Sequence, residues 1–452
     1  MYFFYSILLG IGVLALLPRF LLDAARHGKY AAGLAERAGS LPQFDAGGRR
    51  VVWLHCVSVG ETQAARPLVS ALLEGHPRLA LVVSTTTLTG QRVAREVFGG
   101  RAERVFYFPF DWAWSVRRAL RAVNPWAVLV METELWPRFF RECARRGVPV
   151  ALVNGRVSEK SFGRYKLVRP FIRRVLADLS LAAAQTEADA ARLVALGLAP
   201  ARARVTGNVK FDIEEPESRP LTEELRRRFD ADGGRPLVVA ASTHAPEERV
   251  LLEAFNLLTD AARRPRLLVA PRHPERFKEV AALVEASGFS WARRGDVPRE
   301  RDAECDVVLL DSIGELRAVY ALADVVFVGG SIAPVGGHNV LEPALEARAV
   351  VTGPHTSNFK AIVATLVERG ALVQLPHTSD EAGAARELAR ALRELLDDDG
   401  KRRRLGESAR AVLEQNRGAT ARTVELLAPL LNETSDAGCQ MLVTEKTPAS
   451  DI

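Results

Sequence analysis

The chain has 452 residues and 48% apolar side chains, which is too long for one compact core and predicts a globular protein of two domains. Its four cysteines include no C-x-x-C pair, which argues against a disulfide framework or a cysteine-rich zinc site and favours a reducing compartment. The net charge of +6 divides into +12 over residues 1–215 and −6 over the remainder, so the first half suits an anionic membrane or lipid. Nucleic acid is the competing partner for a basic surface, but the sequence contains no zinc finger, RNP motif or basic helix with interleaved aromatics.

The chain begins with an uncharged apolar run from Tyr2 to Pro18, which basic residues follow. This run is just long enough to span a bilayer, and the basic residues predict that the chain after it stays in the cytoplasm. No positive charge precedes the run and no small-residue cleavage site follows it, which argues against a cleaved signal peptide. We therefore expect residues 1–22 to form an uncleaved membrane anchor, with a helix that lies in the membrane interface as the alternative.

Short β-rich apolar runs then alternate with helical stretches. Five runs in the first half predict strands: RRVVWLHCVS, LALVVSTTT, RVFYFPF, AVLVMETE and VPVALVNGR. The rhythm pauses at the acidic, proline-containing residues 212–229 and restarts with PLVVAAST, RLLVAPR, CDVVLLDS, ADVVFVGGS and AVVTGP. This alternation predicts two Rossmann-like α/β domains with doubly wound parallel sheets, whose sites at the carboxyl ends of the strands face each other across a cleft. We expect the domains over residues 30–215 and 216–431, and a disordered tail over residues 432–452.

The segment FVGGSIAPVGGHNVLEPALEA, residues 327–347, carries the strongest signal for a ligand site in the second domain. Glycines let the backbone approach a ligand closely, and N–H groups at the start of a helix bind phosphate. Glu342 follows one turn later, where a carboxylate can accept two hydrogen bonds from ribose hydroxyls. The alternative is a glycine-rich turn with an acidic residue that the helix dipole favours. The pattern is not G-x-G-x-x-G after a first strand, so a nicotinamide cofactor is disfavoured.

Two further polar loops follow predicted strands of the second domain. AASTHAPEE contains Ser242 and Thr243, and VAPRHPER contains Arg272 and His273. Each loop alone is also explained by a helix cap or a surface turn. Three polar loops at successive strand ends together favour a single nucleotide-binding edge.

Polar residues also follow the predicted strands of the first domain. In SVGET, Glu61 lies where a helix should begin, so it either caps that helix or takes part in acid–base chemistry. METELWP places Glu132 and Glu134 at a strand end, where two carboxylates could share protons or bind sugar hydroxyls, with capping and solvation as the alternative. NGRVSEKSFGRYK and GNVKFD add Arg156 and Lys210, whose charges suit phosphate or carboxylate groups.

These motifs resemble those of the Kdo transferases, the 3-deoxy-D-manno-octulosonic acid transferases that act on lipid A precursor in lipopolysaccharide assembly. The matching segments are SVGET, METELWP, NGRVS, GNVKFD, STH, PRHPER, GGSIAPVGGHNVLEPA and GPHTSNF, and they extend in the family's order from about residue 50 to about residue 360. The resemblance implies a GT-B fold and an inverting transfer of Kdo from CMP-Kdo to lipid IVA, without a cofactor or a bound metal. It also implies a location at the cytoplasmic face of the bacterial inner membrane.

The resemblance further implies roles for individual residues. Glu61 would be the general base that deprotonates a sugar hydroxyl of the acceptor, and Glu132 ranks slightly above Glu134 as a second catalytic carboxylate. A helix N-terminus lowers the pKa of a carboxylate, so Glu61 would be a weak base unless it is partly desolvated. Glu134, Arg156 and Lys210 would contact the acceptor or the carboxylate of Kdo. The residues expected to bind the nucleotide sugar are Ser242, Thr243, Arg272, His273, Gly336, Gly337, His338, Asn339 and Glu342.

Two other functions are compatible with the sequence. A GT-B enzyme with a different donor, such as a UDP-sugar transferase or a sugar-nucleotide epimerase, would bind UDP and not CMP. A non-catalytic anchored module for anionic lipid would bind membranes without nucleotide, and the three polar loops of the acidic half argue against it. The motifs do not specify how many Kdo residues are added.

Overall fold

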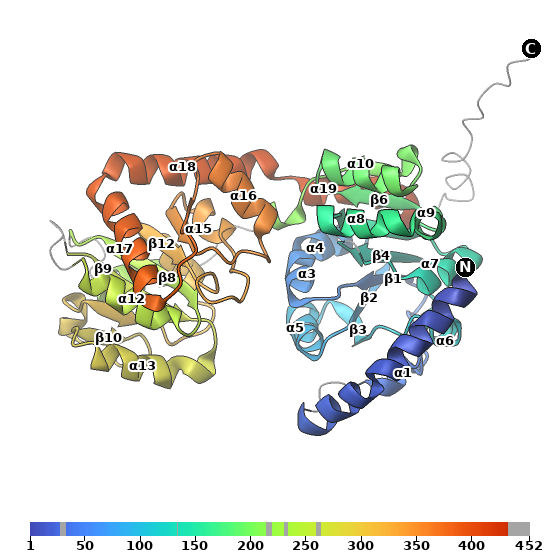
Figure 1. Ribbon diagram of the computed structural model, residues 1–452, viewed down its shortest axis with the longest axis horizontal. Helices are drawn as coiled ribbons and strands as arrows, with labels where there is room; N and C mark the ends of the chain where they lie inside the picture. Colours follow the sequence, from blue (N-terminus) through green and yellow to red (C-terminus); the bar gives the residue numbers. More distant parts are fainter. Residues whose placement is uncertain (28–32, 133, 214–218, 230–233, 259–263, 433–452) are drawn as a thin grey trace, which may run out of the picture. The chain divides into compact units, whose positions relative to one another are not determined.

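The computed structural model describes residues 1–27, 33–132, 134–213, 219–229, 234–258 and 264–432. The chain divides into two compact units, which are described separately. Unit 1 comprises Met1–Asp212 and Arg417–Ile452, and unit 2 comprises Ile213–Asn416 (Figure 1). The expected tail lies outside the described residues from residue 433 onward.

Unit 1 is built on a parallel sheet of seven strands in the order β3-β2-β1-β4-β5-β6-β7. Its strands are β1 (Arg50–His55), β2 (Leu79–Thr85), β3 (Ala102–Tyr107), β4 (Ala127–Met131), β5 (Val150–Gly155), β6 (Leu181–Ala184) and β7 (Ala203–Val205). Its helices are α1 (Tyr2–His27), α2 (Leu34–Arg37), α3 (Val59–Ala64), α4 (Arg66–Gly75), α5 (Leu88–Phe98), α6 (Ala113–Val123), α7 (Pro137–Arg145), α8 (Glu159–Leu167), α9 (Arg169–Ala177), α10 (Glu187–Leu196) and α19 (Ala419–Leu431), with short 3-10 turns η1 (Pro200–Arg202) and η2 (Val209–Phe211). Successive side chains of a strand face opposite sides of the sheet, so Trp53 and Leu54 of β1 contribute to two different cores.

The first helix of unit 1 corrects the prediction of a membrane-spanning anchor. In the part of the chain that the structure describes, no helix combines the length and the apolar character needed to cross a membrane. The apolar run before Arg19 is shorter than the roughly 20 residues that a bilayer needs. The beginning of α1 is instead attached to the rest of unit 1 by polar contacts: Tyr2 Oη donates to Asp178 at 2.7 Å, and Tyr5 Oη donates to Asp111 at 2.8 Å.

Unit 2 repeats the plan of unit 1 with a parallel sheet in the order β10-β11-β9-β8-β12-β13-β14. Its strands are β8 (Leu237–Thr243), β9 (Arg266–Pro271), β10 (Trp291–Arg293), β11 (Val307–Leu309), β12 (Val325–Val328), β13 (Ala349–Thr352) and β14 (Val373–Gln374). Its helices are α11 (Arg219–Arg228), α12 (Glu247–Asn256), α13 (Phe277–Ala286), α14 (Leu316–Tyr320), α15 (Leu341–Leu345), α16 (Lys360–Glu368), α17 (Glu381–Asp397) and α18 (Asp399–Asn416), with 3-10 turns η3 (Pro274–Arg276) and η4 (Glu300–Ala303). The two sheets confirm the expectation of two α/β domains with parallel strands.

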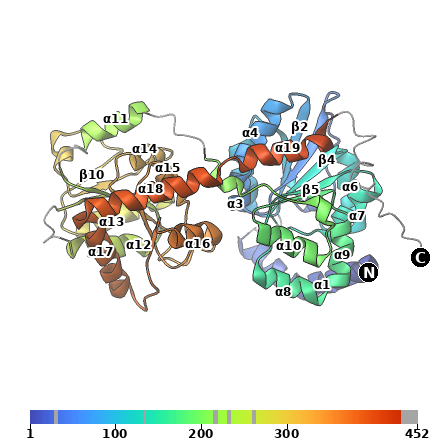
Figure 2. The same cartoon turned by 90° about the horizontal axis from the view of Figure 1, so that it is seen from above.

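The closing helix α19 belongs to unit 1, although the sequence places it with the second domain. It lies beside α4, as Figure 2 shows, and its Leu427 and Leu431 pack into the core below. Asp212, the last residue before the chain enters unit 2, caps α19 by accepting hydrogen bonds from the N–H groups of Gly418 at 2.6 Å and Thr420 at 2.5 Å. The two segments that connect the units are therefore joined to each other within unit 1.

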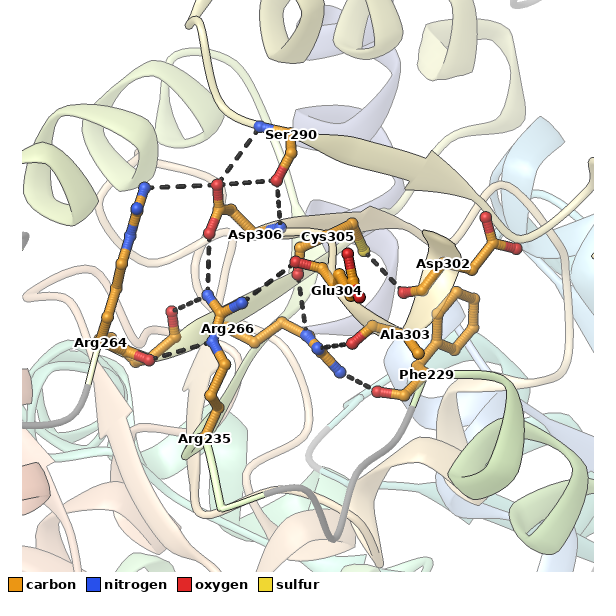
Figure 3. A network of polar contacts seen from close by, with 11 residues as sticks. Phe229, Arg235, Arg264, Arg266, Ser290, Asp302, Ala303, Glu304, Cys305 and Asp306 are labelled. Carbon is orange, nitrogen blue, oxygen red and sulfur yellow. Dashed lines mark hydrogen bonds and ion pairs between the residues drawn. The ribbon is translucent and has the colours of Figure 1, made fainter. Parts of the chain in front are cut away.

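A network of buried arginine contacts closes the amino-terminal edge of the unit 2 sheet (Figure 3). Arg266 begins β9 with only 4% of its surface exposed, and its guanidinium donates to the carbonyl oxygens of Phe229, Ala303 and Cys305. Asp306 beside it accepts from Arg235 at 2.9 Å, and Ser290 and Arg264 contact the same carboxylate. This edge is opposite to the carboxyl ends of the strands, so the network stabilises unit 2 away from its candidate site.

Candidate active site

Glu61 lies in the first turn of α3, directly after the loop that ends β1. Ser58 is the N-cap of α3, and its hydroxyl both accepts from the Glu61 N–H at 3.3 Å and donates to Glu61 Oε1 at 2.9 Å. The N–H of Val57 donates to Glu61 Oε2 at 2.8 Å. The sequence allows Glu61 either a capping or a catalytic role. In the structure its carboxylate accepts hydrogen bonds from the N-cap residue and the residue before it, in a reciprocal arrangement of the capping-box type.

The electrostatic surroundings of Glu61 favour a base that works near neutral pH. Only 7% of the residue is exposed. Burial raises the pKa of Glu61 to about 7; the hydrogen bonds from Val57 and Ser58 oppose this rise, and the charges of Glu132 and Glu134 add to it. Desolvation therefore outweighs the effect of the helix terminus that the sequence alone suggests.

Glu132 and Lys210 form a contact that the sequence predicts only as separate residues. Glu132 follows β4 and Lys210 lies in η2, yet Lys210 Nζ donates to Glu132 Oε1 at 3.0 Å. Glu134, two residues further along, has its pKa raised by burial and by the charge of Glu132. Arg156 follows the end of β5, the strand next to β4, so it lies at the same edge of the sheet.

Three non-glycine residues at strand ends have a left-handed backbone. The φ angles are 53° at Glu132, 55° at Asn154 and 54° at Ser242, which follow or end β4, β5 and β8. Side chains other than glycine adopt this region at a cost, and such strain concentrates at functional sites. The sequence predicts Glu132 and Ser242 as site residues, whereas it does not single out Asn154.

In unit 2, three histidines gather at the carboxyl ends of β8, β9 and β12. The Nε2 atoms of His244 and His338 are 2.8 Å apart, and the rings of His244 and His273 contact edge to face at 5.0 Å. Burial lowers the pKa of His338 to about 3, and the charge of His244 and of Arg272 lowers it further. The loops that contain STH, PRHPER and GGH thus lie together, as the sequence predicts. His244 was not among the predicted ligand residues.

The structure brings the side chains of Asn339 and Glu342 together. Asn339 Nδ2 donates to Glu342 Oε1 at 3.2 Å, and its Oδ1 accepts from the Leu341 N–H at 3.1 Å. Burial raises the pKa of Glu342, and the nearby charge of Arg317 opposes this. Thr243 differs from the expectation: it is fully buried and its hydroxyl donates to Glu248 at 2.8 Å, so it supports the loop from inside.

Glu247, the first residue of α12, is fully buried and was not among the residues predicted from the sequence. Its Oε2 accepts from the N–H groups of His244 at 2.9 Å and Gly330 at 2.8 Å. Its Oε1 accepts from Ser331, Ile332 and Ala333 at 2.9, 2.8 and 3.2 Å. The N–H groups of residues 330–333 are therefore occupied by a carboxylate of the protein and do not bind phosphate. The only sequence signal was a pair of glutamates after the STH motif, which a helix start also explains.

Within the described residues, no group of three or more histidine, cysteine, aspartate or glutamate side chains is arranged to hold a metal ion. The polar groups of the two sites are instead acids, bases and hydrogen-bond donors. In unit 1 they offer a buried carboxylate for proton transfer beside an ion pair. In unit 2 they offer imidazoles, an arginine and a carboxylate–amide pair at the carboxyl edge of a parallel sheet, which is where such sheets bind nucleotides.

Solved structures share this architecture. A UDP-GlcNAc 2-epimerase from Neisseria meningitidis matches with a TM-score of 0.55 at 13% identity, over 84% of this chain and 99% of that chain. A glycosyltransferase from Rickettsia africae matches with a TM-score of 0.55 at 12% identity, over 85% of this chain and 100% of that chain. At such low identity these matches show the fold alone, which is the two-domain α/β arrangement consistent with GT-B glycosyltransferases.

Sequence comparisons identify the family. A family model described as 3-deoxy-D-manno-octulosonic-acid transferase (kdotransferase) matches residues 32–213. The 3-deoxy-D-manno-octulosonic acid transferase of Haemophilus influenzae is 35% identical over 95% of this chain and 98% of its own length. The enzyme of the same name from Bordetella pertussis is 38% identical over 83% of this chain and 86% of its own length. The chain therefore belongs to the 3-deoxy-D-manno-octulosonic acid transferase family and is a glycosyltransferase, as its motifs indicate.

Proposed function

We propose that the protein transfers Kdo from CMP-Kdo to lipid IVA in lipopolysaccharide assembly, by an inverting reaction without a metal. Glu61 carries the proposal, because it is a buried carboxylate with a pKa raised to about 7, held by Val57 and Ser58 in a fixed orientation. Such a carboxylate is ionised in a large share of molecules at neutral pH and is basic enough to accept a proton.

The proposed chemistry is a single displacement. A hydroxyl oxygen of the acceptor forms a bond to the anomeric carbon of Kdo while the bond from that carbon to the phosphate of CMP breaks. Glu61 accepts the hydroxyl proton, and CMP leaves with the bonding electron pair. Attack from the side opposite the leaving group inverts the anomeric carbon. The ion pair of Lys210 and Glu132 is proposed to orient the acceptor or the carboxylate of Kdo beside Glu61.

The donor nucleotide is proposed to bind at the carboxyl edge of the unit 2 sheet. Glu342, oriented by Asn339, suits the ribose hydroxyls, while Arg272 and the histidines face the phosphate. Ser242, which has a left-handed backbone near the end of β8, lies at the same edge and is proposed to contact the nucleotide. A donor screen with CMP, UDP and ADP by calorimetry tests this assignment, and binding of UDP without CMP would contradict it.

The acceptor is a lipid, and the outer face of α1 suggests how the enzyme reaches it at the cytoplasmic face of the inner membrane. One side of the helix contacts unit 1 through Tyr2 and Tyr5. The opposite side exposes six large apolar side chains, namely Phe3, Phe4, Ile7, Leu8, Ile11 and Leu14. An apolar face of this kind suits a helix that lies in the membrane interface and does not span it.

The decisive test is an assay with CMP-Kdo and lipid IVA in which the mass of the product is measured. Glu61→Gln keeps the size of the side chain but removes the base, so turnover is expected to fall by about 10²-fold or more, with CMP binding retained. Glu74→Gln, at an exposed position of α4, is the matched control. Near-normal turnover of Glu61→Gln would exclude the role of general base, and the product mass counts the Kdo residues added.

A further inference from the structure

A cavity of about 410 Å³ lies in unit 2 beside the glycine loop, and among the described residues that line it Gly336 alone is predicted from the sequence as a site residue. Its walls come from the loop that contains Gly336, from the loop after β13 and from the first turns of α16. This volume falls within the range of small-molecule sites. The polar residues that line it are His355, Thr356, Ser357, Lys360 and Gln374.

The loop after β13 is attached to the glycine loop by hydrogen bonds. The N–H of His355 donates to the carbonyl of Ser331 at 2.8 Å, and the N–H of Gly353 donates to the Ser331 hydroxyl at 2.8 Å. Asn358 adds three bonds, from its N–H to Gly336 O at 2.9 Å and from Nδ2 to Val335 O at 3.3 Å and to Gly337 O at 3.2 Å. Glu247 holds the other end of the glycine loop, so the two walls form one preorganised structure.

The lining of the cavity has the chemistry of a site for an acidic sugar. Hydroxyl groups, an imidazole and an amide can bond to sugar hydroxyls, and the ammonium of Lys360 can pair with a carboxylate. Among the described residues, no aspartate or glutamate lines this cavity, so an anionic ligand meets no carboxylate in those walls. A neutral hexose has no charged group to pair with Lys360, whereas a sugar acid can bond to the hydroxyl groups of the lining and pair with the lysine.

We propose that this cavity is the subsite for the sugar acid of the nucleotide-sugar donor, with Lys360 pairing with its carboxylate. The inference rests on the proposed function and deepens it. Gly336 belongs both to the cavity wall and to the loop where the nucleotide is expected, so a sugar linked to that nucleotide extends directly into the cavity. Lys360 is thus a specificity residue for the sugar and does not contact the nucleotide.

The role of the Lys360 charge is tested by Lys360→Met in the full-length protein, with CMP and CMP-Kdo as probes. The KM for CMP-Kdo is expected to rise about tenfold, because a charge-assisted hydrogen bond is lost. The affinity for CMP, measured by calorimetry, should stay within about twofold, and Lys360→Arg should restore most of the KM. Lys278→Met changes another exposed lysine of the same unit and should alter neither value.

The need for an open cavity is tested by Ala364→Trp, which places a large side chain of α16 in the cavity. It should abolish use of CMP-Kdo while CMP still binds, whereas Ala361→Trp, an exposed position of the same helix outside the cavity lining, should have no effect. An equal effect of Lys360→Met on CMP and CMP-Kdo, or no effect on either, would overturn the inference. A wild-type protein that binds CMP but does not use CMP-Kdo would overturn the proposed function instead, so the two failures are distinguishable.

Discussion

His244 and His338 come from motifs almost a hundred residues apart, and their Nε2 atoms are 2.8 Å from each other. Only one of the two nitrogens can carry the hydrogen in this contact, so the pair fixes opposite tautomers in its two rings. Both rings have a lowered pKa, chiefly because of burial; the charge of His273 further lowers the pKa of His244, and the charge of His244 further lowers the pKa of His338. The pair therefore stays neutral at physiological pH, although it faces the edge where a phosphate is expected.

The histidine pair gives a prediction for titration. His338 should not titrate between pH 7 and about 4, because its pKa is lowered from 6.5 to about 3. The unfolded chain binds this proton first, so His338 makes the folded state less stable as the pH falls below about 6.5. NMR titration of the imidazole signals checks this, and His244→Ala should raise the pKa of His338. A midpoint for His338 near 6.5 in the wild type would show that the pair is not formed.

The pH dependence of catalysis should report Glu61. The Glu61 carboxylate acts as a base only when it is ionised. Because its pKa is raised to about 7, kcat/KM should rise with pH, and this acidic limb of the profile should have its midpoint near pH 7. Glu132→Gln removes a negative charge that raises this pKa, and the limb should move to lower pH even if the rate falls. Glu142→Gln changes a buried carboxylate elsewhere in unit 1 and should leave the limb in place. An unshifted limb in Glu132→Gln would contradict the coupling.

Glu247→Gln should loosen the glycine loop without touching the ligand. The amide offers one acceptor oxygen in place of two and turns its NH₂ group toward backbone N–H donors, so the free energy of unfolding should drop by about 3 kcal/mol. CMP affinity should fall by roughly tenfold, because the loop is no longer preorganised. Asp302→Asn, which removes a buried carboxylate bonded to Arg228 at the opposite sheet edge, controls for stability alone. Equal losses of CMP affinity in both variants would assign the effect to general destabilisation.

The arginine network of Figure 3 should matter for stability and not for catalysis. Arg266→Met leaves three buried carbonyl oxygens without their donor, and we expect the free energy of unfolding to fall by about 3 kcal/mol. Arg264→Met removes a half-exposed partner of Asp306 and should cost about 1 kcal/mol or less. Chemical denaturation measures both, and kcat at low temperature should be unchanged. A loss from Arg264→Met as large as that from Arg266→Met would contradict this ranking.

The exposed face of α1 predicts peripheral membrane binding. Replacing Phe3, Phe4 and Leu8 by serine should lower partitioning into anionic phospholipid vesicles by more than about tenfold, because each large apolar side chain contributes roughly 1.5 kcal/mol or more when buried. Co-sedimentation with vesicles measures the effect. Val297→Ser removes an even more exposed apolar side chain from unit 2 and should not change partitioning. Unchanged partitioning of the triple variant would remove α1 from the membrane contact.

The strands and their terminal loops were predictable because parallel strands of this type are continuous apolar runs with polar residues at their carboxyl ends. That pattern led to Glu61, Glu132 and the GGH loop, which the structure places at those ends. It could not show that Lys210 reaches Glu132, because their contact joins segments 78 residues apart and depends on η2.

Other features could not be predicted from the sequence, because a simpler explanation accounts for the same residues. Glu247 lies where a helix starts, a position at which acidic residues are common, and only the fold reveals the backbone N–H groups that donate to it. The apolar start of the chain predicts a membrane span. Tyr2 and Tyr5 lie on one face of α1 and make polar contacts there, but their rings also fit an apolar run, so the sequence does not reveal this face. The course of α19 was unpredictable because its helical pattern continues almost directly from that of α18.

Unit 2 is an insertion within unit 1, because the chain returns to unit 1 after it and Asp212 there caps α19. The ribosome therefore synthesises all of unit 2 before it makes the helix that completes unit 1. Until α19 emerges, the core around Leu68 and Leu72 of α4 lacks the apolar side chains of Leu427 and Leu431 that pack into it. The unit that is begun first is thus finished last, which reverses the usual N-terminal-first order of domain folding.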